Sequence, residues 1–438
     1  MQAGRTLWQS MLWRGLYYAS AFFINILITR HFEASVSGSV YYLSSIYALV
    51  VLLSSLSIES GIIYYSAKAQ IPVERLFSFS LLWALMSGLL TFLVIFIFFT
   101  KAYPGIPGSL LIVSAVLYIS GNLLTTYCSG FFYARNDFRL PNLIIITGNM
   151  ILIFLIPYNG SSVIPGINNE NYFYIYFSSF FVQGMVMAIA AKIKYIKAGL
   201  YHIISLAEFR LLFRYCALAF TGNVIFFLLY RIDYFFVERY CTADELGNYI
   251  QVSKLVHLFF ILPTILASAV FPMSAGEQNE GFSKMLSLLS RSIFFLYAIS
   301  CLVLGLTGQW LFPMLFGASF TGMYLPFLML VPGILALSGI FTLTAYFAGK
   351  NRIKINNRAA LYSLIVILAG DIIFIPKYGI AAAALVSSIG YIVFQVYIIR
   401  AFKKEYECSV ADFFIFRLSD WKQIKMSISA SLKMKNES

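Results

Sequence analysis

Apolar residues gather into twelve long runs separated by short polar segments, with six runs in each half of the chain. Most runs hold about 20 residues with few charges, which is the length of helix that crosses the hydrocarbon core of a bilayer. We therefore predict an all-α integral membrane protein with twelve transmembrane helices. The runs are residues 12–29, 38–65, 77–100, 109–133, 140–157 and 172–191 in the first half, and 212–237, 249–271, 293–312, 322–347, 359–375 and 379–399 in the second.

Polar motifs at the ends of these runs repeat between the two halves. The segment 28–32 with the following Gly38 has a counterpart 209 positions later, in the segment 237–241 with the following Gly247. Two further loops occupy matching places, Ala134-Arg135-Asn136-Asp137 and Gly349-Lys350-Asn351-Arg352, and each leads to a turn that contains Pro. Parallel repeats of six spans are typical of transporters, in which two helical bundles surround a central cavity. We predict two pseudo-symmetric six-helix lobes around such a cavity, at residues 1–192 and 212–402, joined by a cytoplasmic linker at 193–211.

The composition excludes an ordinary soluble protein. Hydrophobic residues make up 60% of the chain and charged residues only 11%, whereas a soluble domain holds about 25% charged residues. The loops are too short for a soluble catalytic domain, the three histidines lie far apart, and the five cysteines have neither metal-binding nor disulfide spacing. We therefore predict a transporter and no enzyme, with no cofactor and no metal site.

Basic residues fall mainly on one side of the predicted topology. With the N-terminus in the cytoplasm, 25 of the 31 Lys and Arg residues lie in cytoplasmic segments, and Arg30, Lys101, Arg239 and Lys377 lie outside. This bias predicts that both termini are cytoplasmic. It also explains the net charge of +13, and because the basic residues are spread over separate loops we expect no nucleic-acid partner.

The last segment, residues 403–438, is a basic amphipathic tail. Aromatic residues such as Phe414 and Trp421 alternate with Arg417, Lys422 and Lys425. This composition is typical of a helix that lies on an anionic membrane surface. A partly disordered basic tail that only follows the positive-inside rule fits the same residues.

Few charged residues lie inside the predicted spans, and each is a candidate for function because a charge in hydrocarbon costs a few kcal/mol or more. Arg14 in the first span and Asn223 in the seventh occupy equivalent positions under the 209-residue offset. A substrate that enters from the cytoplasm would pass between them. Arg30 and Arg239, at the outer ends of the same spans, are candidates for the rim of the cavity, although such residues more often snorkel to the interface.

Two interpretations stay open for the charged residues of the seventh and eighth spans. Arg231 and Asp233 lie two residues apart, so their side chains point about 200° apart around one helix. Arg231 and Lys254 can offer positive charge to a phosphate-bearing substrate, with Asp233 positioning them. Alternatively, Asp233 and Lys254 form an ion pair that ties two helices together.

Glu59 in the second span and Asp371 in the eleventh are lone carboxylates. Each can carry a coupling proton or bind sodium, so coupling to H+ or Na+ is one interpretation. The simpler interpretation is a neutral carboxyl group that is hydrogen-bonded to a neighbouring helix.

In combination, these motifs resemble the bacterial polysaccharide repeat-unit flippases, of the O-antigen and capsule type, in the multidrug/oligosaccharidyl-lipid/polysaccharide exporter superfamily. The resemblance covers residues 12 to about 402 and depends on the motifs of the first and seventh spans, the Ala134-Arg135-Asn136 loop and the turn Ile375-Pro376-Lys377-Tyr378-Gly379. It implies a V-shaped fold with two six-helix lobes. It also implies that undecaprenyl-pyrophosphate-linked oligosaccharide moves from the cytoplasmic to the periplasmic leaflet of the inner membrane, for the biosynthesis of a surface polysaccharide such as lipopolysaccharide.

The resemblance further implies a cationic lumen for the pyrophosphate, which Arg14, Arg231 and Lys254 can supply. Because the spans hold few cations, a neutral glycan fits. The expected partners are the lipid-linked oligosaccharide, membrane lipids and the polysaccharide polymerase machinery, and we expect a monomer.

Other functions fit parts of the same pattern. A drug or metabolite exporter driven by sodium or protons would use a carboxylate such as Asp371. A lipid II flippase would be expected to have two further spans. A membrane-embedded glycan polymerase or acyltransferase would need larger outer loops than residues 158–171.

Overall fold

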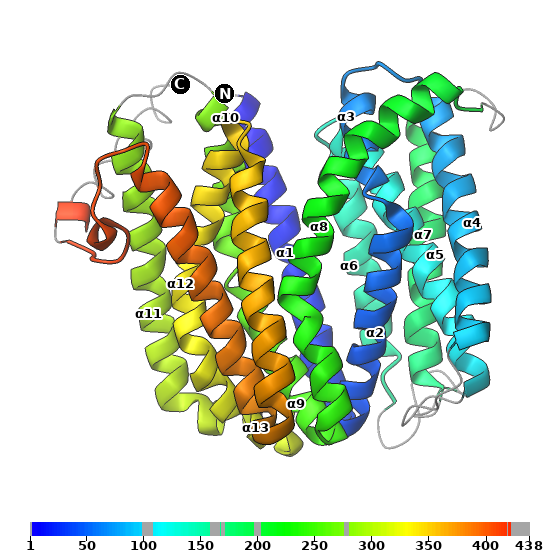
Figure 1. Ribbon diagram of the computed structural model, residues 1–438. Coiled ribbons are helices and arrows are strands. Elements are labelled where there is room, and N and C mark those ends of the chain that lie inside the picture. The colour runs from blue at the N-terminus through cyan, green and yellow to red at the C-terminus, as the bar shows by residue number, and fades with distance from the viewer. Residues whose placement is uncertain are drawn as a thin grey trace. The chain divides into compact units, whose positions relative to one another are not determined.

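The computed structural model describes residues 2–98, 108–157, 167, 171–196, 203–275, 280–417 and 419–421, and nearly all of them are helical (Figure 1). No strand occurs within these ranges. The helices are α1 (Gln2–His31), α2 (Ala34–Ser55), α3 (Ile58–Ala67), α4 (Val73–Phe98), α5 (Gly108–Tyr133), α6 (Arg139–Phe154), α7 (Tyr172–Tyr195), α8 (Leu206–Tyr240), α9 (Ala243–Leu258), α10 (Ile261–Ala275), α11 (Glu280–Phe316), α12 (Tyr324–Gly349) and α13 (Ile353–Lys403), with the 3-10 helices η1 (Ala318–Met323) and η2 (Val410–Phe413).

Each predicted span overlaps a helix. Among the described residues, 10 helical segments are long and apolar enough to cross a membrane, and α6 is a shorter apolar helix of 16 residues. The 51-residue α13 contains the last two predicted spans, which meet at Gly379, where φ of 60° and ψ of −145° interrupt the helix. The prediction of an all-α integral membrane fold is confirmed, and the chain is a multi-pass membrane protein.

Two predicted spans are divided into shorter helices. The span at 38–65 forms α2 and α3, and the span at 249–271 forms α9 and α10. The first of these spans exceeds the about 20 residues that a straight crossing needs, so a break within it is compatible with a single passage through the membrane.

The duplicated loops have the same backbone geometry. Asn136 and Asn351 each adopt φ of 58°. In both loops the Asn N–H donates to a carbonyl three residues earlier, and the next N–H donates to a carbonyl five residues earlier. This pattern ends a helix through a left-handed residue, a conformation that Asn tolerates better than most residues. The repeat that the sequence predicts therefore extends to the local backbone.

Packing divides the chain into two compact units. Unit 1 contains Met1–Tyr234, Thr242–Ile250 and Pro313–Phe320, and unit 2 contains Phe235–Cys241, Gln251–Phe312 and Thr321–Ser438. The predicted lobes follow the sequence repeat, whereas these units follow contacts, so the lobe boundaries stay predictions. Within the predicted linker, residues 197–202 lie outside the described residues.

Unit 1 has an aromatic core. Helices α5 and α7 pack along each other, and α4 packs on α5 (Figure 1). Tyr47 of α2, Tyr118 of α5 and Phe177 of α7 form mutual ring contacts with centroids 5.4 to 5.6 Å apart. Most of α8, through Tyr234, belongs to this unit, and Glu208 near its start forms an ion pair of 2.8 Å with Arg75 of α4.

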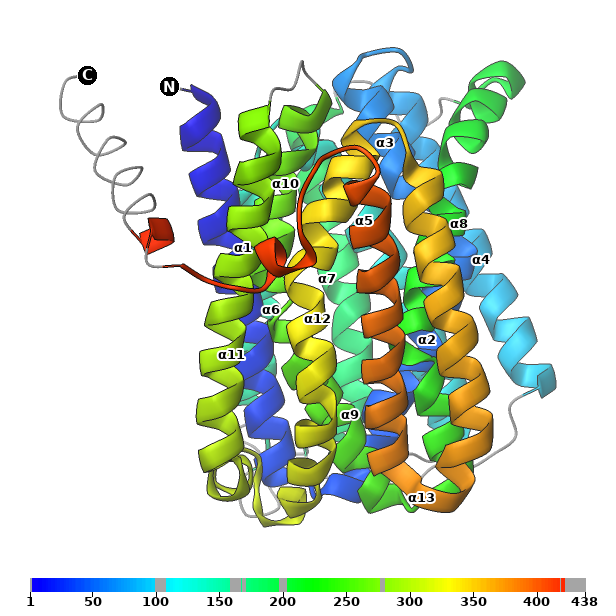
Figure 2. The same cartoon turned by 60° about the vertical axis from the view of Figure 1, so that its left-hand side comes forward.

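Unit 2 is built on α12 and α13, which pack along each other, and α10 packs on α12 (Figure 2). Pro332 interrupts the hydrogen-bond ladder of α12, because proline has no N–H to donate. The Ser388 hydroxyl of α13 bridges the interruption, since it donates to the Met329 carbonyl (2.6 Å) and accepts from the Gly333 N–H (3.2 Å).

The described part of the tail folds back on unit 2 (Figure 2). Phe413 is fully buried, and Phe414 and Phe416 contact Phe294 and Phe295 of α11 with ring centroids 5.2 and 4.7 Å apart. This part comprises the 3-10 helix η2, irregular backbone up to residue 417 and a helical stretch at 419–421, and the predicted surface helix stays a prediction. Residues 422–438 of the predicted tail lie outside the described residues.

Candidate functional site

The junction of α2 and α3 places irregular backbone among the helices of unit 1. Leu56 and Ser57 both adopt left-handed conformations, with φ of 48° and 56°, at a cost of roughly 1–2 kcal/mol for each non-glycine residue. The carbonyl of Ser54, just before the break, accepts a hydrogen bond of 2.7 Å from Nε1 of Trp83 on α4. Such backbone is tolerated at membrane depth only where protein or a polar cavity satisfies it, so the break marks a polar position in the unit.

Asn223 contacts this break from α8. Its Nδ2 donates to Oγ of Ser57 over 2.9 Å. Asn223 is itself exposed, and its amide nitrogen holds the break. The sequence prediction included Asn223 as a cavity residue but did not include Ser57 as its partner.

Glu59 lies in the first turn of α3, next to the break, and is half-buried. It interacts electrostatically with Tyr127 of α5 and Cys216 of α8. Its Oε2 atom is buried and has no hydrogen-bond partner among the described residues. A carboxyl group in such a position can hold a proton or accept a cation. Both interpretations of Glu59 stay predictions.

Arg14 lies on α1 beside the loop that follows α5. Its guanidinium carbon is 5.6 Å from the ring centroid of Tyr133 and 5.7 Å from that of Phe138. Contacts of this kind contribute about 0.5–1 kcal/mol at exposed sites. Arg14 is exposed, and the rings orient its guanidinium while leaving N–H donors for an anion. Arg14 and Asn223, which are equivalent in the repeat, thus contact different parts of unit 1.

An ion pair ties the same loop to α7. Oδ2 of Asp137 lies 2.6 Å from Nζ of Lys194 and accepts a hydrogen bond of 3.4 Å from the Tyr195 hydroxyl. Burial of the Asp137 carboxyl opposes its ionisation, but the hydrogen bond and charge of Lys194 outweigh burial, and the pKa of Asp137 is lowered. The loop therefore carries an ionised carboxylate under most conditions.

Helix α8 directs Arg231 and Asp233 to different partners. The guanidinium carbon of Arg231 is 5.2 Å from the ring centroid of Phe227, and its charge acts on the hydroxyl of Tyr118 on α5. Asp233 is buried and accepts hydrogen bonds from the Tyr234 N–H (2.9 Å) and the Tyr249 hydroxyl on α9. Tyr249 is a partner that sequence reasoning missed.

The remaining candidates lie in unit 2 or at helix ends. Lys254 of α9 is half-buried, and Asp371 is fully buried in the first half of α13. The proposed pairing of Asp233 with Lys254 stays a prediction, as does a coupling role for Asp371. Arg30 and Arg239 are exposed near the ends of α1 and α8.

The two motif glycines meet at the ends of α2 and α9 within unit 1. A Cβ atom on Gly38 would lie 2.5 Å from Cα of Gly247, so the two backbones touch. Ser319 of η1 joins this contact, because its Oγ accepts from the Ala34 N–H (3.1 Å) and its carbonyl accepts from Nδ2 of Asn248 (3.0 Å). The two glycines stand out in the sequence because they occupy repeated positions. Their spacing along the chain does not show that they contact each other.

These groups have a common chemistry. Exposed or half-buried guanidinium groups on aromatic rings suit a phosphate or pyrophosphate, because charge-assisted hydrogen bonds to such anions are strong. Tyr and Asn side chains suit sugar hydroxyls, and a half-buried carboxylate such as Glu59 suits a proton or a cation. Among the described residues no group of three or more His, Cys, Asp or Glu side chains is arranged to hold a metal ion.

The fold is that of transporters in the multidrug/oligosaccharidyl-lipid/polysaccharide exporter superfamily. The chain is similar to the lipid II flippase MurJ in an inward closed conformation, with a TM-score of 0.70 and 16% identity over 92% of this chain and 89% of that one. It is also similar to multidrug resistance MATE transporters in an inward-facing form (TM-score 0.66, 13% identity, 89% and 94% covered) and an outward-facing form (0.64, 14%, 91% and 95%). No protein-family model matches the chain, and no curated protein matches its sequence.

Proposed function

We propose that this protein is a flippase that moves undecaprenyl-pyrophosphate-linked oligosaccharide repeat units from the cytoplasmic to the periplasmic leaflet by alternating access. The observation that carries the proposal is the shared fold with a lipid II flippase over 92% of the chain. The sequence motifs at residues 28–38 and 231–237 add to this support.

The physical task explains why such a fold is needed. A pyrophosphate and a polyhydroxylated glycan cannot cross about 30 Å of hydrocarbon unaided, whereas a prenyl tail is stable in lipid. On this proposal Arg14 and Arg231 bind the pyrophosphate at successive stages, and Lys254 adds positive charge. Asn223 and the tyrosines bind sugar hydroxyls.

The energy source is part of the proposal. Glu59 next to the α2–α3 break, and Asp371 buried in α13, are the carboxylates through which a proton or sodium gradient would act. On this proposal the protein is a transporter without a cofactor, in the bacterial inner membrane, with both termini in the cytoplasm. The partners are the lipid-linked oligosaccharide and the polysaccharide polymerase machinery.

A gradient-driven exporter of drugs or metabolites is the second candidate, because the fold is also shared with MATE transporters. The test is deletion of the gene followed by analysis of lipid-linked intermediates and surface polymer. The flippase proposal expects repeat units to accumulate on the cytoplasmic leaflet and the polymer to disappear, with both restored by the intact gene. Normal polymer together with hypersensitivity to drugs would favour the exporter.

A further inference from the structure

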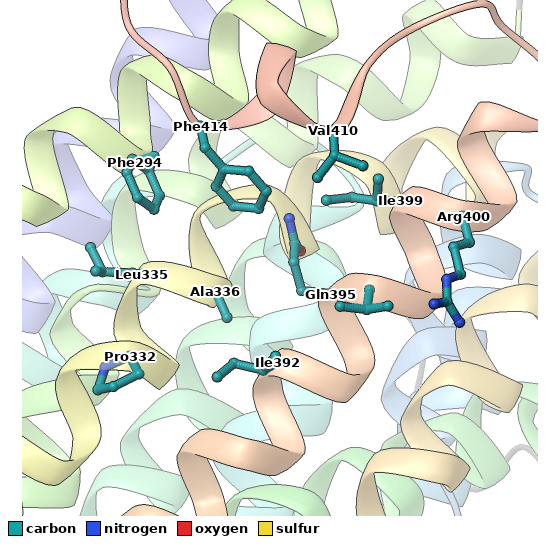
Figure 3. Close-up of a pocket in the computed structure, with 11 residues that line it drawn as sticks. Phe294, Pro332, Leu335, Ala336, Ile392, Gln395, Ile399, Arg400, Val410 and Phe414 are labelled. Carbon is teal, nitrogen blue, oxygen red and sulfur yellow. The ribbon is translucent and has the colours of Figure 1, made fainter.

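Unit 2 contains a cavity of about 310 Å³ between α11, α12, the second half of α13 and the folded-back tail (Figure 3). Apolar side chains such as Pro332, Ala336, Ile392 and Phe414 form most of its lining. The volume is at the lower end of the range of about 300–1,000 Å³ for ligand pockets. A cavity of this size and lining suits one hydrocarbon chain better than a bulky polar ligand.

One polar side chain points into this apolar cavity. Gln395 is 3% exposed, and both Oε1 and Nε2 lack a hydrogen-bond partner among the described residues. Its carboxamide is directed toward Val410 and Phe414 of the tail (Figure 3). A buried amide without partners is costly, so a ligand that brings a hydrogen-bonding group to this point would be stabilised by Gln395.

A cation lies at the rim of the cavity. Arg400 is exposed and lines the cavity five residues beyond Gln395 on α13, which places it about 7.5 Å farther along the helix axis. The segment from Gly379 to Arg400 is long enough to span the hydrocarbon core. A membrane span that starts at Gly379 would place Arg400 at the level of lipid head groups and Gln395 at the level where acyl chains join the glycerol.

The cavity continues an apolar stripe on the outside of α13. Leu385, Ile389, Ile392 and Val396 are spaced three or four residues apart and are 44, 44, 39 and 41% exposed. Ile392 and Val396 also line the cavity. In a membrane protein such a stripe faces lipid chains, so a chain has a continuous apolar path into the cavity.

The tail that covers the cavity is held by specific contacts. Phe414, which lines it, packs edge-on against Phe294 of α11, and Arg291 of α11 lies 2.5 Å from Oδ1 of Asp420. Asp412 caps the tail by accepting from the Ser409 N–H and from Arg417, and these contacts lower the pKa of Asp412. The tail segment that covers the cavity is therefore a folded part of unit 2.

We propose that this cavity binds one acyl chain of an anionic glycerophospholipid. The chain fills the apolar space, an ester carbonyl accepts a hydrogen bond from Nε2 of Gln395, and the phosphate lies at Arg400. The site is separate from the residues assigned to the flipped substrate, and this inference does not depend on the proposed function.

The first test measures lipid retention by native mass spectrometry of the purified full chain, titrated with phosphatidylglycerol. We expect Arg400→Gln to weaken retention of one lipid about fivefold, in line with the contribution of a single basic residue near an anionic surface. Ala336→Phe, which fills the cavity, should abolish that retention. The matched control is Lys403→Gln, an exposed cation three residues along the same helix that does not line the cavity, and it should bind as the wild type does.

The second test separates a ligand role for Gln395 from a structural one. Without lipid, Gln395→Leu should melt at a higher temperature than the wild type, because it removes an unsatisfied buried amide. Added phosphatidylglycerol should raise the melting temperature of the wild type more than that of Gln395→Leu. Equal increases in both proteins, equal losses in Arg400→Gln and Lys403→Gln, or preferential retention of a polyprenyl phosphate over phosphatidylglycerol would each overturn the proposal.

Discussion

At the scale of single residues, two candidate cations of unit 1, Arg14 and Arg231, rest on aromatic rings. Arg14 contacts Tyr133 and Phe138, and Arg231 contacts Phe227. A ring face fixes the position of a guanidinium group but does not neutralise its charge or use all of its N–H donors. Such a cation remains able to bind a phosphate that arrives and leaves, whereas a tight carboxylate partner would compete with the substrate.

Arg231→Gln should therefore lower transport without unfolding the protein. A charge-assisted hydrogen bond contributes about 1.5–3 kcal/mol, so we expect a loss of about tenfold or more in surface polymer per molecule of protein in complemented deletion cells. Arg231→Lys, which keeps the charge but loses the planar fork, should retain part of the activity. The control is Arg210→Gln, an exposed cation in the first turns of the same helix. An equal loss of surface polymer in both Gln variants would show that Arg231 is not part of the substrate site.

Asp137 predicts a pH effect at the same scale. Its pKa is lowered in the folded protein, so the ion pair with Lys194 stabilises the fold above the unfolded value of about 4 and is lost as the pH falls through the folded value. Asp137→Asn should lose less than about 1 kcal/mol at pH 7, because Lys194 is largely exposed. Melting curves of both proteins in detergent should converge as the pH is lowered to 3. A constant difference between pH 7 and pH 3 would contradict this assignment.

At the scale of helices, the repeated glycine motif produces one close contact between the starts of α2 and α9. The contact is made by backbone, through Gly38 and Gly247, and Ser319 closes it with hydrogen bonds. Two helix ends that touch in this way have little freedom to accept a larger side chain, because packed backbone cannot move aside as a side chain can. The contact is thus sensitive to a single methyl group.

Gly38→Ala should impair the protein through this contact. The added Cβ would lie 2.5 Å from Cα of Gly247, so the two helix ends must separate. We expect polymer output to fall several-fold and the melting temperature to fall, in keeping with the typical cost of about 1–3 kcal/mol for overpacking. Gly305→Ala on α11 is the matched control, because its Cβ would meet only a Leu328 methyl at 3.7 Å. Similar output from both variants would show that the contact can open without cost.

The sequence predicts the helices well and their breaks poorly. Apolar runs, the positions of the duplicated loops and the turn at Gly379 all correspond to structural features, because each depends on local periodicity or on a residue with a distinct backbone preference. The break at Leu56 and Ser57 has no such signature, since neither residue favours a left-handed conformation. Only the excess length of the predicted span indicated it.

The charged residues of the candidate site can be predicted from the sequence, whereas their partners cannot. Charge inside an apolar run identifies Arg14, Glu59 and Arg231 directly. Their partners do not follow from the sequence, because the contact of Asn223 with Ser57 joins residues 166 positions apart. Gln395 was missed because an uncharged amide in a span does not stand out, and only the apolar cavity around it reveals its unsatisfied hydrogen bonds.

At the scale of the whole molecule, the distribution of basic residues predicts an orientation that a labelling experiment can check. The loop at Gln70 should be cytoplasmic and the turn at Tyr378 periplasmic, and both residues are exposed. With the half-buried Cys241 and Cys408 replaced by Ser, a membrane-impermeant maleimide should label Tyr378→Cys in intact spheroplasts and Gln70→Cys only after lysis. Labelling of both variants after lysis controls for access. The opposite pattern would show that the predicted topology is inverted. Arg14 would then lie on the periplasmic side, away from a substrate that is made in the cytoplasm.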